Sequence, residues 1–313
     1  MLEKVSSPEI TPEVTVAVCT RKRRELIQKC LASLLCQETS VLYEIIVTEN
    51  DFERESWPII EPFSAEAEKK GISLRYFCEP RQNIALARNL CIRESRAPFL
   101  LFIDDDEWAA TDWIEKMMEI QRRVDADVVQ GTCVPIFADG FPERLKKYCS
   151  MYRYEACEEE IVRVPGVATN TTLYRLSALA EREEPLNPKY GTSGGSDFEL
   201  SLYLDGRGKT QYKTCLAKVY EFQPISRGRL RFFLERDFRE ALNTFRAIRS
   251  HCGRVGAIRF VLFRLRGHFV TVLKAFVTLP IHPIGSFIHM LESLTCTLGL
   301  FAALLGFRKR GYF

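Results

Sequence analysis

Three consecutive aspartates have the clearest capacity for chemistry in this sequence. Asp104, Asp105 and Asp106 directly follow the apolar run 99–103. Such a run is too short for a buried helix and predicts a buried strand. Carboxylates at the end of that strand lie where open α/β sheets bind ligands, and a hard cation such as Mg²⁺ or Mn²⁺ relieves their repulsion. The run predicts a metal–diphosphate site; the alternative is a solvated acidic turn before a helix over 111–124, capped by Thr111 or Asp112.

Alternating strand and helix patterns surround this run. Apolar strands are expected at 14–19, 43–47 and 74–78, and helices over 26–35 and 83–93. This alternation predicts an α/β fold with a doubly wound, mostly parallel sheet.

Polar residues follow the expected strands, at Thr20 and Arg21 and again at Glu49 and Asn50. The carboxyl ends of parallel strands meet at one edge, so these residues would share a crevice with the aspartates. There a basic loop can face phosphate, and a carboxylate can accept hydrogen bonds from a ribose or a base. The expected ligand is a nucleotide, with Thr20, Arg21, Glu49, Asn50, Asp104 and Asp105 on the donor side.

Four motifs in order resemble the family 2 glycosyltransferases of the GT-A fold. They are Val-Cys-Thr-Arg at 18–21, Asn-Ile-Ala-Leu-Ala-Arg-Asn at 83–89, Asp-x-Asp at 104–106 and Gly-Gly-Ser-Asp at 194–197. The resemblance implies a Rossmann-like GT-A fold over residues 14–240, with a nucleotide-binding half (14–110) and an acceptor half (111–240). It also implies inverting transfer of a sugar from a nucleoside-diphosphate sugar to an acceptor hydroxyl.

The resemblance assigns roles to single residues. Asp104 and Asp106 are the expected metal ligands, for Mg²⁺ or Mn²⁺, and Asp197 is the expected catalytic base. Arg88 is placed beside the nucleotide. The alternatives are that Asp197 caps the helix 197–204 and that Arg88 is an ordinary exposed helix arginine.

On the acceptor side the resemblance indicates Asn170 and the glycine loop before Asp197. Gly194 and Gly195 allow a sharp turn and a close approach to substrate. The family commonly has Glu where this chain has Ser196, which puts that acceptor contact in doubt. Related enzymes place diphosphate-binding arginines further on; the alternative is a solvated or lipid-facing basic surface. The arginines are Arg227, Arg231, Arg236 and Arg239.

Charge is distributed unevenly, although the net charge is only +3. Residues 226–313 hold 15 Lys and Arg against 4 Asp and Glu. Within them, 256–279 has the pattern of a basic amphipathic helix, which is typical of a lipid interface. The largely apolar segment 284–307 is interrupted by His289 and Glu292, so an interfacial or re-entrant helix fits better than a crossing. A soluble helical subdomain and a spanning hairpin are the alternatives; no recognisable nucleic-acid motif is present.

These patterns predict a flexible tail at 1–13 and a membrane-association region at 241–313. The basic Arg308, Lys309 and Arg310 indicate the cytoplasmic face of the inner membrane, with a peripheral or re-entrant mode of attachment. The 11 cysteines show no Cys-x-x-Cys pair, as expected in a reducing cytosol. Membrane attachment and the resemblance together imply a lipid-linked saccharide acceptor in polysaccharide biosynthesis.

Three other functions compete with this interpretation. A nucleotidyltransferase of similar fold would need a Gly-rich basic loop near the N-terminus, whereas 20–24 contains no glycine. A degenerate sugar-binding or scaffold protein would not need Asp104, Asp106 and Asp197. A processive membrane synthase would carry several long transmembrane helices and a Gln-x-x-Arg-Trp motif, and the sequence shows neither.

Overall fold

The computed structural model describes residues 11–149 and 159–307 of the 313-residue chain. Most of the predicted tail 1–13 therefore lies outside the described residues. The strands are β1 (Val14–Thr20), β2 (Tyr43–Glu49), β3 (Ser73–Cys78), β4 (Phe99–Asp104), β5 (Glu107–Ala109), β6 (Val128–Phe137), β7 (Ile161–Arg163), β8 (Thr172–Arg175) and β9 (Gln211–Gln223). The α-helices are α1 (Arg24–Leu35), α2 (Trp57–Lys69), α3 (Ile84–Glu94), α4 (Trp113–Val124), α5 (Glu143–Tyr148), α6 (Leu176–Leu179), α7 (Ser196–Gly206), α8 (Leu230–Thr278) and α9 (Pro283–Leu304).

One mixed sheet runs through the described residues in the order β3-β2-β1-β4-β8-β6-β9-β5, with β7 paired to β9. The first four strands in this order are mutually parallel, whereas β8 is antiparallel to both β4 and β6. The parallel strands are near-continuous apolar runs because helices cover both of their faces. The predicted α/β fold with a mostly parallel sheet is confirmed.

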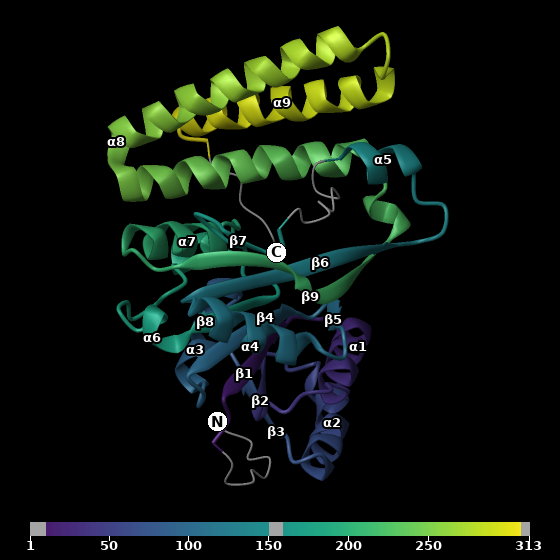
Figure 1. Cartoon of the computed structure of the whole chain (residues 1–313), viewed down its shortest axis with the longest axis vertical. Helices are drawn as coiled ribbons and strands as arrows, with labels where there is room; N and C mark the ends of the chain where they lie inside the picture. The colour runs from purple at the N-terminus through teal and green to yellow at the C-terminus, as the bar shows by residue number, and fades with distance from the viewer. Residues whose placement is uncertain (1–10, 150–158, 308–313) are drawn as a thin grey trace.

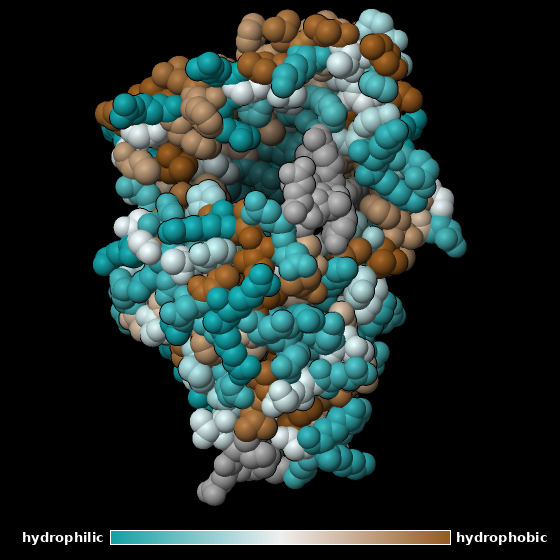
Figure 2. Space-filling view, in the orientation of Figure 1, coloured by the Kyte–Doolittle hydropathy of each residue, from teal (hydrophilic) through white to brown (hydrophobic). Residues whose placement is uncertain are grey.

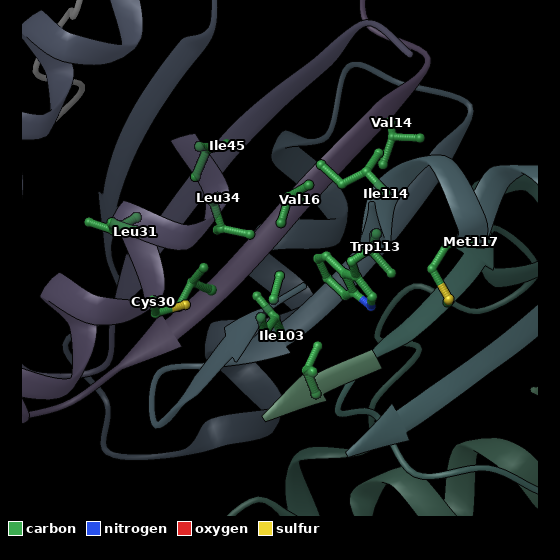
Figure 3. Close-up of a cluster of buried hydrophobic side chains, with 14 of the residues drawn as sticks. Val14, Val16, Cys30, Leu31, Leu34, Ile45, Ile103, Trp113, Ile114 and Met117 are labelled. Atoms are coloured by element: carbon green, nitrogen blue, oxygen red, sulfur yellow. The ribbon is translucent and has the colours of Figure 1, made fainter. Parts of the chain in front are cut away.

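Two apolar cores lie on opposite faces of this sheet. Side chains alternate along β1, so Val16 enters the core beneath α1, α2 and α4, whereas Ala17 enters the core beneath α3 and α7. Figure 3 shows Val16, Ile103 and Trp113 converging in the first core. These two layers fix the strand ends that carry the polar residues.

Helices α8 and α9 form a helical hairpin, which is a third layer at one end of the molecule, far from β2 and β3 (Figure 1). Gly253 interrupts α8 with φ +67° and ψ −171°, and the second part of the helix folds back beside α9. The hairpin has its own small core, which includes Leu242, Val261 and Leu300. The predicted boundary at 240 falls inside α8, and the residue at which this helix is interrupted is Gly253.

A half-buried carboxyl, Asp237, lies at the interface between α8 and α9. Asp237 Oδ2 is buried and has no hydrogen-bond partner among the described residues. Burial, followed by the negative charges of Glu292 and Glu240, raises the pKa of Asp237 to about 7, and Arg236 only partly opposes this. Cys296 of α9 faces the same group.

This raised pKa predicts a pH dependence of stability. The unfolded chain has an Asp pKa of about 3.9, so the favourable contribution of Asp237 is present below pH 4 and is lost as pH rises towards 7. At pH 8, Asp237→Asn should therefore have a higher urea midpoint than the wild type. Its free energy of unfolding should be higher by about 1–3 kcal/mol, after discounting for the partial exposure of the group. The gain should shrink towards pH 4. The exposed Asp205→Asn is the control, and an equal response of the two variants would contradict the prediction.

Candidate functional site

The carboxyl ends of β1, β2 and β4 bring the predicted polar residues to one edge of the sheet. Thr20 pairs in register with Glu49, and Cys19 pairs with Asp104. The aspartates follow β4 directly, so they lie beside the loop after β1. The site therefore has an acidic run on one side and a basic loop on the other.

The Asp105 side chain points into the protein and is hydrogen-bonded by residues at the end of β1 and in the loop that follows it. Its carboxylate is buried and accepts hydrogen bonds from Thr20 Oγ1 and Arg23 Nη1, each at 2.8 Å. Arg23 Nη1 also donates to Asp106 Oδ2 at 3.1 Å. The aspartates on either side of Asp105 remain partly open, because the Asp104 and Asp106 side chains are 41% and 16% exposed.

Negative charge exceeds positive charge around Asp106. Burial, followed by the negative charges of Asp104 and Glu221, raises the pKa of Asp106 to about 7, and the charge of Arg23 opposes this shift. Carboxylate oxygens short of compensating charge are a donor set that suits Mg²⁺ or Mn²⁺. Among the described residues, no group of three or more His, Cys, Asp or Glu side chains converges as a metal site.

Arg88 lies between the acidic run and the predicted base. It is on α3, its side chain is 12% exposed, and Nη2 donates to Asp104 Oδ1 at 3.1 Å. After the cost of burial, the charge of Asp104 raises the pKa of Arg88 most, and Asp197 adds to this. Arg88 is thus a buried guanidinium near both carboxylates, so the solvent-exposed alternative is wrong.

Arg227 lies against the acidic run at the end of β9. Its Nη2 is 3.7 Å from Asp106 Oδ2, and Nη1 is paired with Glu221 Oε1. In contrast, Arg231 and Arg236 pair with glutamates four residues further along α8, and Arg239 lies one turn beyond Arg236. The structure therefore places one predicted diphosphate arginine, Arg227, at the aspartates.

Asn170 is held at the acidic run by Glu107. Glu107 is buried, and Oε1 accepts from Asn170 Nδ2 at 2.9 Å while Oε2 accepts from the Asp104 amide at 3.1 Å. Burial, followed by the charge of Asp104, raises the pKa of Glu107 well above its usual range. Asn170 is thereby fixed beside Asp104.

Glu49 and Asn50 direct their polar atoms into the protein. Glu49 is fully buried and accepts from the Ser56 hydroxyl at 2.9 Å. Asn50 Nδ2 donates to the Arg81 carbonyl at 2.6 Å. Arg21 lies nearby, with Nε 3.3 Å from Asp51 Oδ2. Contact of Arg21, Glu49 or Asn50 with a donor stays a prediction.

The loop before α7 carries Asp197. Gly194 and Gly195 have φ values of +86° and +88°, which favour glycine. Gly195 occupies the N-cap position of α7, so Asp197 lies inside the first turn and is not its cap. Asp197 Oδ1 accepts from the Phe198 amide at 2.9 Å. Ser196 is buried, which turns it away from solvent.

One side of this loop is docked on the start of α3. Asn83 caps α3, and its Nδ2 donates to the Pro188 carbonyl at 2.9 Å. The Ile84 amide donates to the Gly191 carbonyl at 3.2 Å. The same helix therefore positions Arg88 and the loop of Asp197.

Three residues that contact or face the aspartates were not among the predicted site residues, namely Arg23, Glu107 and Glu221. Arg23 is part of the basic run 20–24, and Glu107 continues the acidic run, so both had a signal. Glu221 had none, because it reaches the site through the pairing of β9 with β5, in which it is opposite Glu107.

Comparisons with known proteins agree on one family. The sequence model described as Glycosyl transferase family 2 matches residues 15–182. The chain is 29% identical over 235 residues to the succinoglycan biosynthesis protein ExoM of Rhizobium meliloti (strain 1021), covering 74% of each chain. A crystal structure of S. aureus TarS 1–349 in complex with UDP is similar, with a TM-score of 0.50, 13% identity and coverage of 95% of this chain and 93% of that one. Another TarS crystal structure has a TM-score of 0.51 at 14% identity, and the match spans 78% of this chain but 44% of that longer one. At these identities the structural likeness shows a shared fold.

The close approach of Gly191 to α3 predicts that it tolerates no side chain. A Cβ there would lie 1.7 Å from Asn83 Oδ1 and 2.9 Å from the Ala85 amide nitrogen. Gly191→Ala should lower the free energy of unfolding by about 1–3 kcal/mol, because the loop must move off the helix. Urea denaturation measures this. Gly206→Ala is the matched control, since nothing lies within 4 Å of its Cβ. Equal stability of the two variants would show that the loop is not held here.

Proposed function

We propose, from the premise that this chain belongs to glycosyl transferase family 2 and is a glycosyltransferase of the GT-A fold, that it transfers a sugar with inversion. The donor would be a nucleoside-diphosphate sugar. The observation that carries the proposal is the position of Arg88, a buried guanidinium that binds Asp104 and lies near Asp197. It would join the diphosphate side and the acceptor side into one site.

The donor side would use Asp104 and Asp106 as ligands for Mg²⁺ or Mn²⁺. Such an ion is typically held by one or two carboxylates together with substrate phosphates, and it neutralises the negative charge that develops on the leaving diphosphate. Arg227 lies beside Asp106, and its Nη2 could donate a charge-assisted hydrogen bond to a phosphate oxygen. Thr20 and Arg23 hold Asp105 inward, so the partly exposed Asp104 and Asp106 would be the carboxylates that face the ligand.

The acceptor side would use Asp197 as general base. An acceptor hydroxyl attacks the anomeric carbon from the face opposite the diphosphate, the bond from that carbon to the phosphate oxygen breaks, and Asp197 takes the hydroxyl proton. Asn170 lies beside Asp104 and would contact the donor sugar or the acceptor. Gly194 and Gly195 have positive φ, and they would let the loop turn sharply before Asp197.

The nucleotide and the product are inferred from relatives. UDP is the first nucleotide to test, because UDP is bound in the similar TarS structure. The relative ExoM is described as a succinoglycan biosynthesis protein, which favours a role in polysaccharide biosynthesis here. We extend this to a lipid-linked saccharide acceptor because the hairpin beside the site has the chemistry of a lipid-binding surface.

The outer face of the hairpin combines hydrophobic and hydrophilic side chains (Figure 2). A stripe at helical spacing on α8 is more than half exposed, and it consists of Val255, Ile258, Leu262, Phe269, Leu273 and Phe276. Arg259, Arg264, Arg266 and Lys274 lie on the same part of the helix. Exposed apolar surface flanked by cations is the pattern of a helix that lies in an anionic lipid interface. Within the described residues, α9 is the helix long and apolar enough to cross a membrane, and 33% of its apolar window is buried inside the protein.

We therefore propose a catalytic domain at 14–240 and a membrane-association region at 241–313, in which the lipid-facing surface of α8 begins beyond Gly253. The enzyme would bind the cytoplasmic face of the inner membrane as a peripheral or re-entrant protein. The predicted basic cluster Arg308, Lys309 and Arg310 lies outside the described residues.

The donor site predicts metal-dependent nucleotide binding. In calorimetry with UDP, GDP, CMP and dTDP, one diphosphate should bind tightly with Mn²⁺ and weakly in chelator. Asp106→Ala should weaken that binding at least about tenfold, because it removes one of two carboxylate ligands. Asp112→Ala, at the exposed start of α4, is the control. Equal binding with and without metal for all four nucleotides would overturn the metal-assisted mechanism.

The hairpin predicts binding to anionic vesicles. Co-sedimentation with vesicles of equal parts phosphatidylglycerol and phosphatidylcholine should retain the wild type. Phe269→Ser with Phe276→Ser should weaken retention at least about tenfold, since each phenylalanine loses its apolar burial. Leu42→Ser changes an exposed apolar residue of the catalytic domain and should leave binding unaltered. Undiminished binding of the double variant would assign the membrane contact elsewhere.

A further inference from the structure

The first part of α8 contacts the loop that carries Asp197. Asn243 is 7% exposed, and its Nδ2 donates to the Ser193 carbonyl at 2.7 Å. Ser193 lies four residues before Asp197 in the same loop. This contact is separate from the hairpin face that we assign to lipid.

Arg246 makes a second contact one turn further along α8. Its Nη1 donates to Ser193 Oγ at 2.9 Å, and its guanidinium carbon lies 5.0 Å from the ring centroid of Tyr190. The Tyr190 hydroxyl is in turn 3.2 Å from Ser250 Oγ on the following turn. Successive turns of one helix face therefore bind the loop at Ser193 and Tyr190.

The loop needs external support because its own backbone is permissive. Gly194 and Gly195 are adjacent and both have positive φ, so the unfolded loop has many accessible conformations. The hydrogen bonds from the Ser193 and Gly194 amides both go to the Tyr190 carbonyl, which closes a turn but does not orient it. On one side the start of α3 holds Pro188 and Gly191. On the other side α8 approaches so closely that a Cβ on Gly195 would lie 2.9 Å from Asn243 Cβ.

A further link ties α7 itself to the end of this helix segment. Glu199 is buried, and its Oε1 lies 2.9 Å from His251 Nε2 and 3.2 Å from Arg182 Nη2. Glu199 is two residues after Asp197, so both flanks of the base are tied to α8.

We infer that Asn243 and Arg246 are positioning residues that set the place of the Asp197 carboxylate by fixing the loop from α8. This inference rests on the proposed role of Asp197 as base. It makes the first half of α8 a part of the active site, whereas the second half faces lipid. A displacement of a reacting group by about 1 Å can cost about 10²-fold in rate, so loss of these contacts should act on turnover more than on donor binding.

The test uses Asn243→Leu, which keeps the side-chain size but removes the donor, and Arg246→Met, which removes the guanidinium but keeps the stem. Release of nucleoside diphosphate from a panel of nucleotide sugars gives kcat and KM, with an extract of lipid-linked saccharides as acceptor. Each variant should lower kcat about 10–10²-fold and leave KM for the donor within about twofold. Arg246→Lys should recover part of the loss. Arg249→Gln, exposed and three residues beyond Arg246 on α8, is the matched control and should retain full kcat.

Two further measurements separate positioning from a general loss of structure. Backbone hydrogen exchange over 188–197 should be at least about fivefold faster in Asn243→Leu, with β1 and β4 unchanged. In an Asp197→Asn background, Asn243→Leu should cost less than about threefold, because two changes that act through one group are not additive.

Three results would overturn the inference: unchanged kcat and exchange in Asn243→Leu, an equal loss in both backgrounds, or a joint loss of kcat and donor binding. The proposed function fails in a different way, namely if Asp197→Asn alone retains full turnover.

Discussion

The site depends on a run of carboxylates at the end of β4, of which Asp105 and Glu107 are buried and Asp104 and Asp106 are partly exposed. Buried ionised groups are costly unless they are paired, so Asp104–Glu107 require charge and hydrogen bonds from the surrounding elements. Arg23 from the β1 loop, Arg88 from α3 and Arg227 after β9 supply the charge. These segments are far apart in the chain, and the fold brings them together around the acidic run.

Positive neighbours balance the negative charge of the run only in part, and the unbalanced carboxylates are the ones to which we assign the chemistry. The inward Asp105 and Glu107 are satisfied by Thr20, Arg23 and Asn170. Asp106 keeps a raised pKa despite Arg23, because it is buried close to Asp104 and Glu221. The excess negative charge at the partly exposed carboxylates is the basis of the metal–diphosphate site that we propose.

The parallel half of the fold and its polar edge could be predicted from sequence, because each strand is an uninterrupted apolar run that ends in chemically distinctive residues. Site residues that reach the aspartates through strand pairing or from distant elements could not be predicted from the sequence. Nothing in the spacing distinguishes Arg227, beside Asp106, from Arg231, which pairs with Glu235. The contacts of Asn243 and Arg246 with Ser193 could not be predicted either, because an amphipathic pattern indicates which face of a helix is buried but not which segment covers it.

The central claim is a single displacement in which Asp197 removes the acceptor proton. Its most direct test is the anomeric configuration of the first-formed product, determined by NMR for the wild type and compared with the rate of Asp197→Asn. The account predicts a configuration opposite to that of the donor and a rate lowered about 10²–10⁴-fold by the substitution. Retention of the donor configuration would contradict it.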